Sequence, residues 1–439
     1  MGLSLAFHTV FTPLGVGMPL LLLVAEGIGL KTGDPRYRRL ARSWTPVVGL
    51  LFAVGAVSGT VLSFELGLLW PKFMAYAGGI IGMPFSLEGF AFFTEAIFLG
   101  IYIFGWDRLS PLAHWLCAIP LSISAALSAI FVISANAWMN DPAGFRIVDG
   151  QVTDVDPWAA MFNGAWFHEA LHGTLASYVT TGFAVAAVYA VLIYRGRRDS
   201  QALLGLKVAM AMGAIAIPIQ IVSGDLSARA VAADQPVKFA AMEDVQTTET
   251  GVPLRIGGIP FGSETRYAIE IPMGLSLMTY FSANAEVAGL DSVPPADRPN
   301  EAYTHLAFDL MVGSGMAMLL IGGWFWWSWW RKRRAFRPGR WLLRCVAAGG
   351  VFGFIAIEAG WFVTELGRQP WLVRGYFRTS QGVTERQGIE VFFVLFTLLY
   401  IVISAGLITA LIRWPRKSDE DPRPQAEESD EGRVKSGVA

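Results

Sequence analysis

Side chains that can carry protons or bind iron stand inside long apolar stretches of this sequence. The ones that matter for chemistry are His8, Glu88, Glu95, His168, Glu169, His172, Met311, Glu358 and Glu365. An ionisable group at the centre of a bilayer costs roughly 2.5–3.5 kcal/mol even on a lenient insertion scale, so each one marks a candidate functional site. Glu95 and Glu358 are expected to lie deeper than the others, which should lie near one face of the membrane.

One group of these residues has the spacing of a zinc protease. His168 and His172 are four residues apart on one helix face, with Glu169 between them. A zinc ion would need a third protein ligand, for which Asp225 and Asp309 are the nearest candidates. The pattern therefore predicts one alternative function, an intramembrane zinc metalloprotease that uses His168, Glu169 and His172.

The same residues can instead bind haem. One His and one Met on different helices at the same membrane depth make a six-coordinate, low-spin haem that transfers electrons, and His172 and Met311 have that relation. A further haem with one protein ligand, His8 or Glu365, would keep its sixth position free for oxygen. Together these ligands predict an oxygen-reducing membrane enzyme.

Two carboxylates could serve such an enzyme as a proton path. Glu88 and Glu95 are seven residues apart, so they share a helix face and differ in depth by about 10 Å. A haem-free transporter whose buried carboxylates carry ions is a third class of function that these two residues allow.

Several of these groups also have a purely structural interpretation. Glu358 and Glu365 can form a buried pair that Arg368 satisfies. His114 and His305 stand at the ends of apolar stretches with no companion group, and we interpret them as structural.

The elements that must position these residues are membrane helices. Of the 439 residues 54% are hydrophobic and 16% are charged, whereas a soluble domain carries roughly a quarter charged residues. We predict an all-α polytopic bundle of about nine transmembrane helices, since each needs about 20 apolar residues. The approximate spans are Val10–Leu30, Pro46–Leu66, Ser86–Trp106, His114–Ala137, His172–Tyr194, Leu204–Val222, Ala307–Trp330, Leu342–Val363 and Val391–Ile412.

Basic residues predict the orientation of the bundle. They gather after the first, fifth, seventh and ninth spans, as Lys31, Arg36, Arg38, Arg39, Arg42, Arg195, Arg197, Arg198, Arg331, Lys332, Arg333, Arg334, Arg337, Arg340, Arg413, Arg416 and Lys417. The positive-inside rule places these loops in the cytoplasm, the N-terminus outside and the C-terminus inside. Because the basic blocks are short and lie between apolar runs, nucleic acid is not an expected partner.

This topology divides the chain into four parts. Residues 1–222 form helices one to six, residues 223–306 a long external loop, residues 307–413 helices seven to nine, and residues 414–439 a charged, disordered cytoplasmic tail. Cys117 and Cys345 both lie in apolar segments, so no disulfide framework is expected.

The sequence also resembles a known family, subunit I of the cytochrome bd type quinol oxidases. Residues 360–371, GWFVTELGRQPW, are similar to the family signature at the outer end of helix eight. Supporting matches are LEGFAFFTE at 87–95, GWDRL at 105–109, NAWMN at 136–140 and QPVKFAAME at 235–243. The resemblance covers nearly the whole chain up to about Trp414, and the external loop looks like that of the short-loop class.

The resemblance implies the cofactors and their ligands. His172 and Met311 would be the axial ligands of a low-spin haem b. His8 and Glu365 would ligate two high-spin haems, a haem b and either a haem d or a third haem b, and the resemblance leaves open which ligand serves which ring. Trp361 would contact a haem, and Glu88 and Arg368 would lie at the oxygen-reducing pair.

The resemblance also implies the reaction. Lys238 and Glu243 would bind and deprotonate ubiquinol or menaquinol at the outer face, and Glu95 would belong to the proton route from the cytoplasm. Oxygen would be reduced to water with cytoplasmic protons, which generates a membrane potential without pumping. The expected partners are subunit II of the oxidase and a small single-span subunit, in the cytoplasmic membrane of a bacterium or archaeon.

Overall fold

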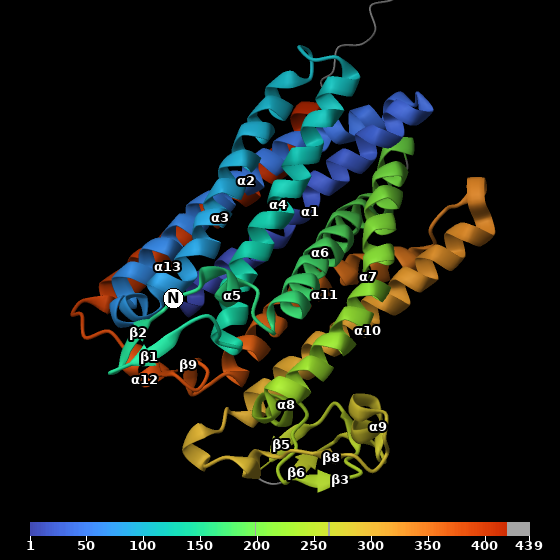
Figure 1. The fold of residues 1–439 in the computed structure, drawn as a ribbon. Coiled ribbons are helices and arrows are strands. Elements are labelled where there is room, and N and C mark those ends of the chain that lie inside the picture. Colours follow the sequence, from blue (N-terminus) through green and yellow to red (C-terminus); the bar gives the residue numbers. More distant parts are fainter. Residues whose placement is uncertain (198, 262–263, 419–439) are drawn as a thin grey trace, which may run out of the picture. The chain divides into compact units, whose positions relative to one another are not determined.

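The structure is a computed structural model that describes residues 1–197, 199–261 and 264–418. Within these ranges nine helices are long and apolar enough to cross a membrane (Figure 1), which confirms the predicted bundle. They are α1 (Gly2–Thr32), α2 (Pro35–Leu69), α3 (Pro71–Gly105), α4 (Pro111–Asn140), α6 (Trp166–Tyr194), α7 (Ser200–Asp234), α10 (Glu301–Lys332), α11 (Arg340–Gly367) and α13 (Ile389–Ser418).

Capping residues set where several of these helices begin. Asp34, Ser110, Asp199 and Asn300 each accept a hydrogen bond from a backbone N–H in the first turn of α2, α4, α7 and α10. Proline follows the cap at the start of α2 and α4, where its missing N–H costs nothing.

The helices run further than their apolar cores. The predicted loop 223–306 was too long at both ends, because α7 continues to Asp234 and α10 begins at Glu301. A helix that projects from a bilayer keeps its own backbone hydrogen bonds, so polar residues do not end it. Hydropathy therefore finds the membrane crossing and misses the projecting turns.

The described chain falls into two compact units, the first Met1–Gln387. The second begins at Gly388 and includes α13, which continues to Ser418. Residues 414–418 of the predicted disordered tail are therefore helical, which corrects that boundary. Arg198 and residues 419–439 lie outside the described residues.

Within the first unit the helices pack as two groups. Helices α1 to α4 pack on one another, while α7 and α11 each pack against both α6 and α10. Helix α6 joins the groups through α1 and α4. Helices α6 and α7 approach closely at Gly182, where an added Cβ would lie 2.5 Å from the backbone nitrogen of Gly213.

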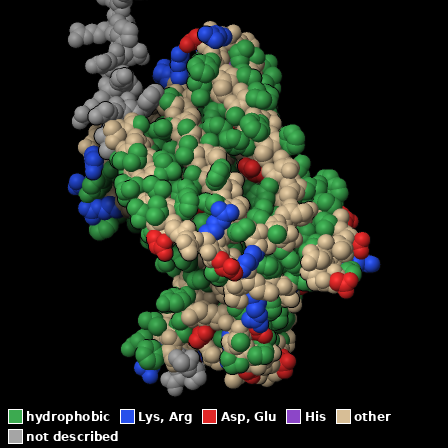
Figure 2. All heavy atoms as spheres, turned by 90° about the vertical axis from the view of Figure 1, so that its left-hand side faces the viewer, with side chains coloured by type: hydrophobic (Ala, Val, Ile, Leu, Met, Phe, Trp, Pro, Cys, Tyr) green, Lys and Arg blue, Asp and Glu red, His purple; other side chains and the backbone are tan. Residues whose placement is uncertain are grey.

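Alternate loops meet at the same end of this unit. Arg38, at the start of α2, donates to the backbone oxygen of Trp106 after α3 at 3.1 Å. Gln201 at the start of α7 donates to the Arg36 backbone oxygen, and Arg344 on α11 donates to the Tyr194 hydroxyl. The basic loops of the first unit thus gather at one end. In the view of Figure 2 hydrophobic side chains cover much of the helical surface.

The long loop between α7 and α10 has its own small core. It contains α8 (Pro236–Met242), α9 (Gly274–Tyr280), 3-10 turns at Leu290–Ser292 and Pro295–Asp297, and the strands β3 (Glu249–Thr250), β4 (Leu254–Ile256), β5 (Ile259–Phe261), β6 (Glu264–Arg266), β7 (Ile269–Ile271) and β8 (Glu286–Val287). The strands pair antiparallel as β3 with β8, β4 with β7 and β5 with β6. Phe239 and Leu275 are among its buried residues.

The shorter connections at the same end also carry structure that the sequence analysis did not predict. Between α4 and α6 lie β1 (Arg146–Val148), β2 (Gln151–Thr153) and α5 (Pro157–Met161). After α11 come β9 (Trp371–Val373), β10 (Phe377–Arg378) and α12 (Thr379–Gly382), and a 3-10 turn, Arg333–Ala335, follows α10 at the opposite end. Arg374 binds the Asp141 carboxylate at 3.2 Å and the Asp234 backbone oxygen, which ties three connections together.

Candidate functional site

Each of the two candidate histidine ligands is held by a serine on a neighbouring helix. His8 Nδ1 on α1 lies 2.8 Å from Ser58 Oγ on α2, and His172 Nδ1 on α6 lies 3.0 Å from Ser223 Oγ on α7. With Nδ1 engaged, Nε2 is the ring nitrogen that a metal could take, the usual arrangement at a histidine ligand. Gln220 lies close to both nitrogens of His172.

A glycine faces each of the three candidate ligands His8, His172 and Met311. An added Cβ would lie 3.4 Å from His8 Cε1 at Gly59, 3.3 Å from His172 Cε1 at Gly224 and 3.2 Å from Met311 Sδ at Gly360. These glycines stand on α2, α7 and α11, each beside the helix that carries the ligand. Because these positions lack a side chain, each candidate ligand packs closely against the neighbouring helix, as is compatible with a crowded site that also holds a flat ring system such as haem.

Glu365 belongs to a buried hydrogen-bond network between α11, α4 and α6. Its Oε2 accepts from Arg368 Nη2 at 2.8 Å, and Arg368 Nη1 also donates to Asn136 and Asn140 at 3.1 and 3.3 Å. The amide nitrogens of both asparagines then donate to the Glu169 carboxylate, at 2.9 and 2.8 Å. One fully buried guanidinium therefore connects two carboxylates from different helices.

This network removes Glu169 from a zinc site. Its carboxylate takes hydrogen bonds from α4, and the expected third ligands are engaged elsewhere, since Asp225 pairs with Arg229 and Asp309 with His305. Across residues 1–197, 199–261 and 264–418, no three His, Cys, Asp or Glu side chains gather as a metal ion would need. The arrangement does not favour the protease.

The predicted pair of Glu358 and Glu365 is wrong in its detail. Arg368 satisfies Glu365, whereas Glu358 Oε1 is buried without a hydrogen-bond partner in the described structure. An orphaned buried carboxylate oxygen is costly and points to a group that the protein chain alone does not supply. Trp361, half-buried on the same helix, stands three residues further on.

The two proton-path candidates lie on the buried side of α3. Glu88 Oε1 accepts from Ser128 Oγ on α4 at 3.1 Å, and Glu95 is 8% exposed. Side chains on the other side of α3, such as Phe90, Phe93 and Phe104, are exposed and face the surroundings. The shared face predicted from the spacing is therefore present.

Lys238 and Glu243 are both buried in the loop, at α8 and just after it. Burial lowers the pKa of Lys238 to about 8. Burial, with a smaller contribution from Asp309, raises the pKa of Glu243 to about 8. Near that pH both groups can exchange protons, as residues that bind and deprotonate a quinol would need.

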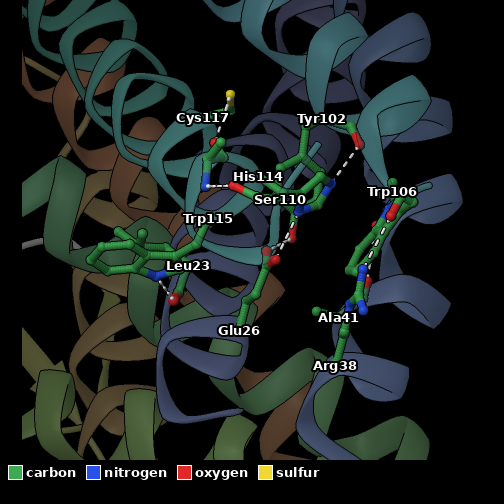
Figure 3. A network of polar contacts seen from close by, with 12 residues as sticks. Leu23, Glu26, Arg38, Ala41, Tyr102, Trp106, Ser110, His114, Trp115 and Cys117 are labelled. Carbon is green, nitrogen blue, oxygen red and sulfur yellow. Dashed lines mark hydrogen bonds and ion pairs between the residues drawn. The ribbon is translucent and has the colours of Figure 1, made fainter. Parts of the chain in front are cut away.

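Both histidines that we interpreted as lacking companions have them. His305 Nδ1 lies 2.7 Å from the Met242 backbone oxygen, and its Nε2 lies 3.3 Å from Asp309 Oδ2. His114 Nδ1 lies 2.7 Å from Glu26 Oε1 (Figure 3). The expectation of no companion group was wrong: Glu26 and the Met242 carbonyl come from other segments of the chain, whereas Asp309 stands one turn further along the same helix.

The sequence analysis did not select the buried carboxylates of Glu26 and Glu65, and it gave Glu169 a different role. Glu26 and Glu65 lie inside the first two predicted spans, so the rule that selected Glu95 would have found them. Glu65 accepts from Ser4 Oγ at 2.7 Å. Glu169 was considered only as part of the zinc pattern, and no sequence signal pairs it with Asn136 and Asn140.

Comparisons with a family model and with known proteins agree on one family. The family described as cytochrome bd terminal oxidase subunit I matches residues 1–419. A Bacillus subtilis (strain 168) protein provisionally described as a cytochrome bd menaquinol oxidase subunit I is 37% identical over 433 residues, which are 96% of either chain. Cytochrome bd ubiquinol oxidase subunit 1 of the same organism is 30% identical over 438 residues, 94% of this chain and 92% of its own.

A solved structure has the same fold. A chain in the structure of the bd oxidase from Geobacillus thermodenitrificans superposes with a TM-score of 0.90 at 38% identity, covering 95% of this chain and 96% of its own.

Proposed function

This chain belongs to the cytochrome bd terminal oxidase subunit I family and is the catalytic subunit I of a quinol oxidase, and from that premise we propose how its own residues divide the work. Membership implies haem cofactors, a quinol substrate and further subunits. The assignment of each residue to a role, the haem types and the orientation in the membrane are our proposals.

His172 and Met311 would hold a low-spin haem b, and His8 and Glu365 the two high-spin haems, one a haem b and one a haem d or a third haem b. Haem bound by these residues would supply one-electron transfer and the reduction of oxygen. Support comes from the glycines that face His8, His172 and Met311, and from the orphaned oxygen of Glu358.

Arg368 would hold Glu365 in place for this role. Its guanidinium is fully buried and binds Glu365 at 2.8 Å, so it fixes the carboxylate and balances its charge. Trp361, on the same helix, would lie beside the ring, and Glu88 would be the last protein carboxylate on the way to the oxygen-reducing pair.

Lys238 and Glu243 would bind quinol in the loop that follows α7. Oxidation of a quinol releases two electrons and two protons, and a buried carboxylate with a pKa of about 8 can accept one of those protons when it is ionised. The Lys238 ammonium would hold the quinol oxygen from which that proton leaves. The substrate would be ubiquinol or menaquinol.

Protons for oxygen reduction would enter from the opposite side, through Glu95 and then Glu88. We place the end of the bundle with the basic loops in the cytoplasm, the N-terminus outside and the C-terminus inside, by the positive-inside rule. The loop with Lys238 then lies outside. Quinol oxidation would release protons outside while oxygen reduction takes them from inside, so the reaction would charge the membrane without a pump.

Subunit II and a small single-span subunit would complete the complex in the cytoplasmic membrane of a bacterium or archaeon. The four parts of the chain would be residues 1–222 and 307–413 in the membrane, the quinol loop within 223–306, and a cytoplasmic tail within 414–439.

The observation that carries the haem assignment is that a glycine on the neighbouring helix faces the ring carbon Cε1 of His8 and of His172 and the sulfur of Met311. An absorption spectrum of the purified oxidase, recorded with its metal content, tests it. Several haems with little zinc are expected. A colourless, zinc-loaded protein would overturn the oxidase assignment and favour the protease that His168, Glu169 and His172 suggested.

A further inference from the structure

A second buried polar cluster lies at the opposite end of the helices from the candidate ligands. Glu26 near the end of α1, Tyr102 near the end of α3 and His114 near the start of α4 are at most 2% exposed. Tyr102 OH donates to Glu26 Oε2 at 2.8 Å, and His114 Nδ1 lies 2.7 Å from Glu26 Oε1 (Figure 3). This end is the one where the basic loops meet.

The hydrogen bonds of the cluster leave one proton mobile. His114 Nε2 lies 2.9 Å from the Tyr102 backbone oxygen, and because a carbonyl can only accept, Nε2 must carry a hydrogen. The contact between His114 Nδ1 and Glu26 Oε1 then holds a single proton. It can belong to the imidazole, which gives an ion pair, or to the carboxyl, which gives a neutral pair.

Tyr102 lines up with the carboxylates already assigned to the proton route. Glu88, Glu95 and Tyr102 follow one another at intervals of seven residues, which places all three on one stripe of α3. Each interval rises about 10 Å along the helix axis. The stripe leads from the Glu26 cluster towards the region of the proposed oxygen-reducing haems.

We propose that Glu26, His114 and Tyr102 form the proton-loading station of this oxidase, the point where protons from the side of the basic loops enter the route to Glu95 and Glu88. The inference rests on the proposed function and extends it by three residues. A second proton that binds the His114–Glu26 pair from the loop side makes His114 cationic and Glu26 neutral, so that Glu26 Oε2 can carry a hydrogen. Glu26 then gives this proton to the Tyr102 oxygen while the hydroxyl gives its own proton through water towards Glu95. Tyr102 therefore stays neutral, and the pair returns to its starting state with one proton.

The surroundings of the cluster suit a controlled entry. Trp106 lies next to His114, with ring centroids 4.2 Å apart, and the guanidinium carbons of Arg38 and Arg42 lie 5.7 and 5.8 Å from the centroid of the Trp106 ring. Arg42 pairs with the exposed Asp107 at 2.7 Å, so an exposed carboxylate stands directly after Trp106 in the sequence. Of the charged or titratable groups in this region, Glu26 and Tyr102 contact His114. Arg38 and Arg42 lie over Trp106, Asp107 pairs with Arg42, and Cys117 lies near Glu26.

The test compares two variants that each remove a buried tyrosine hydroxyl from the complete oxidase. Tyr102→Phe removes the donor to Glu26, whereas Tyr189→Phe, the matched control, removes a hydroxyl that accepts from Trp44 Nε1 at 2.8 Å and touches no carboxylate. We expect Tyr102→Phe to lower quinol-driven oxygen consumption about tenfold or more and to enlarge the effect of D₂O on that rate. Both variants should keep the haem spectrum and the rate at which quinol reduces the haems without oxygen.

Two further variants separate a relay from a structural contact. Glu26→Gln should reduce oxygen consumption as Tyr102→Phe does, and Glu26→Asp should restore part of it, because only a carboxylate can carry the proton. In infrared difference spectra recorded across a pH step, a carboxyl band present in the parent should be lost in Glu26→Gln, which is a readout independent of turnover.

Unchanged turnover and unchanged D₂O sensitivity in Tyr102→Phe would overturn this inference even if Glu26→Gln fails to fold. An equal loss in Tyr189→Phe would also overturn it, since burial alone would then explain the effect. A parent protein that lacks haem would instead overturn the proposed function, so the two failures can be told apart.

Discussion

At the scale of single residues, the contacts of the proposed histidine ligands distinguish them from the other buried histidines. Ser58 and Ser223 engage Nδ1 of His8 and His172, and a glycine on the neighbouring helix faces each ring. His114 and His305 are also buried, but a carboxylate lies at one ring nitrogen of each, Glu26 at His114 and Asp309 at His305. The contrast supports His8 and His172 as the histidines that bind iron.

Loss of either ligand should remove the low-spin haem signal. We expect His172→Ala and Met311→Leu each to abolish the spectrum of a six-coordinate haem, because neither substitute can coordinate iron. Met318→Leu is the matched control, since Met318 is 2% exposed on the same helix and belongs to the hydrophobic core. A six-coordinate spectrum that survives in Met311→Leu would disprove this ligand pair.

Glu243 should give the oxidase a pH dependence. Its pKa of about 8 means that the ionised fraction, which accepts the quinol proton, rises as the pH rises through that value. We expect kcat/KM for quinol to increase with pH up to about 8, and Glu243→Gln to lower it about a hundredfold and remove that rise. Steady-state oxygen consumption over a pH series measures both effects, and a profile that is the same in the variant and the parent would contradict the role.

The same shift sets the sign of a stability effect. The pKa of Glu243 is raised from 4.5 in the folded chain, so the protonated carboxyl stabilises the fold fully below pH 4.5, and this contribution is lost progressively as the pH rises from there through about 8. The thermal unfolding temperature of the parent should therefore fall relative to that of Glu243→Gln between the two ends of this window, and a constant difference would contradict the effect.

At the scale of helices and loops, close packing next to a ligand should be sensitive to one methyl group. Gly360→Ala would place a Cβ about 3.2 Å from Met311 Sδ, so the sulfur must move by a few tenths of an ångström. We expect a shifted low-spin haem spectrum with little loss of stability. Gly313→Ala on α10, where an added Cβ meets nothing within 4 Å, should leave the spectrum unchanged. Equal spectra for the two variants would contradict the proposed ring position.

The quinol loop should depend on one buried hydroxyl. Ser276 Oγ accepts from the Val252 backbone N–H at 2.9 Å and donates to the Ala285 backbone oxygen at 2.8 Å, so it joins three segments of the loop. We expect Ser276→Ala to cost about 1–3 kcal/mol locally and to speed proteolytic cleavage between residues 244 and 300. The exposed Ser282→Ala is the control. Equal cleavage rates for these two variants would show that the hydroxyl does not hold the loop together.

Elements were predicted better than contacts. Hydropathy located all nine spans found among the described residues, because a helix that crosses lipid must be apolar along its length. It could not find the strands of the loop, which are two or three residues long and carry no clear alternation. Nor could it pair Glu26 with His114 or Glu169 with Asn140, since those contacts depend on how helices far apart in sequence pack.

At the scale of the whole molecule, the proposed function separates two kinds of chemistry. The basic loops and the Glu26 cluster lie at one end of the first unit, and the ends of α7 and α10 that enclose Lys238 and Glu243 belong to the other. If quinol is oxidised at one side and protons are taken up from the other, every electron transferred to oxygen moves charge across the membrane.

The most direct test of this account measures membrane potential and oxygen consumption together in vesicles that contain the complete oxidase in one known orientation. Adding quinol should start oxygen consumption and make the side of the basic loops negative, with the proton that each electron requires taken from that side. Oxygen consumption without a potential, or with the protons taken from the side of the quinol loop, would contradict it.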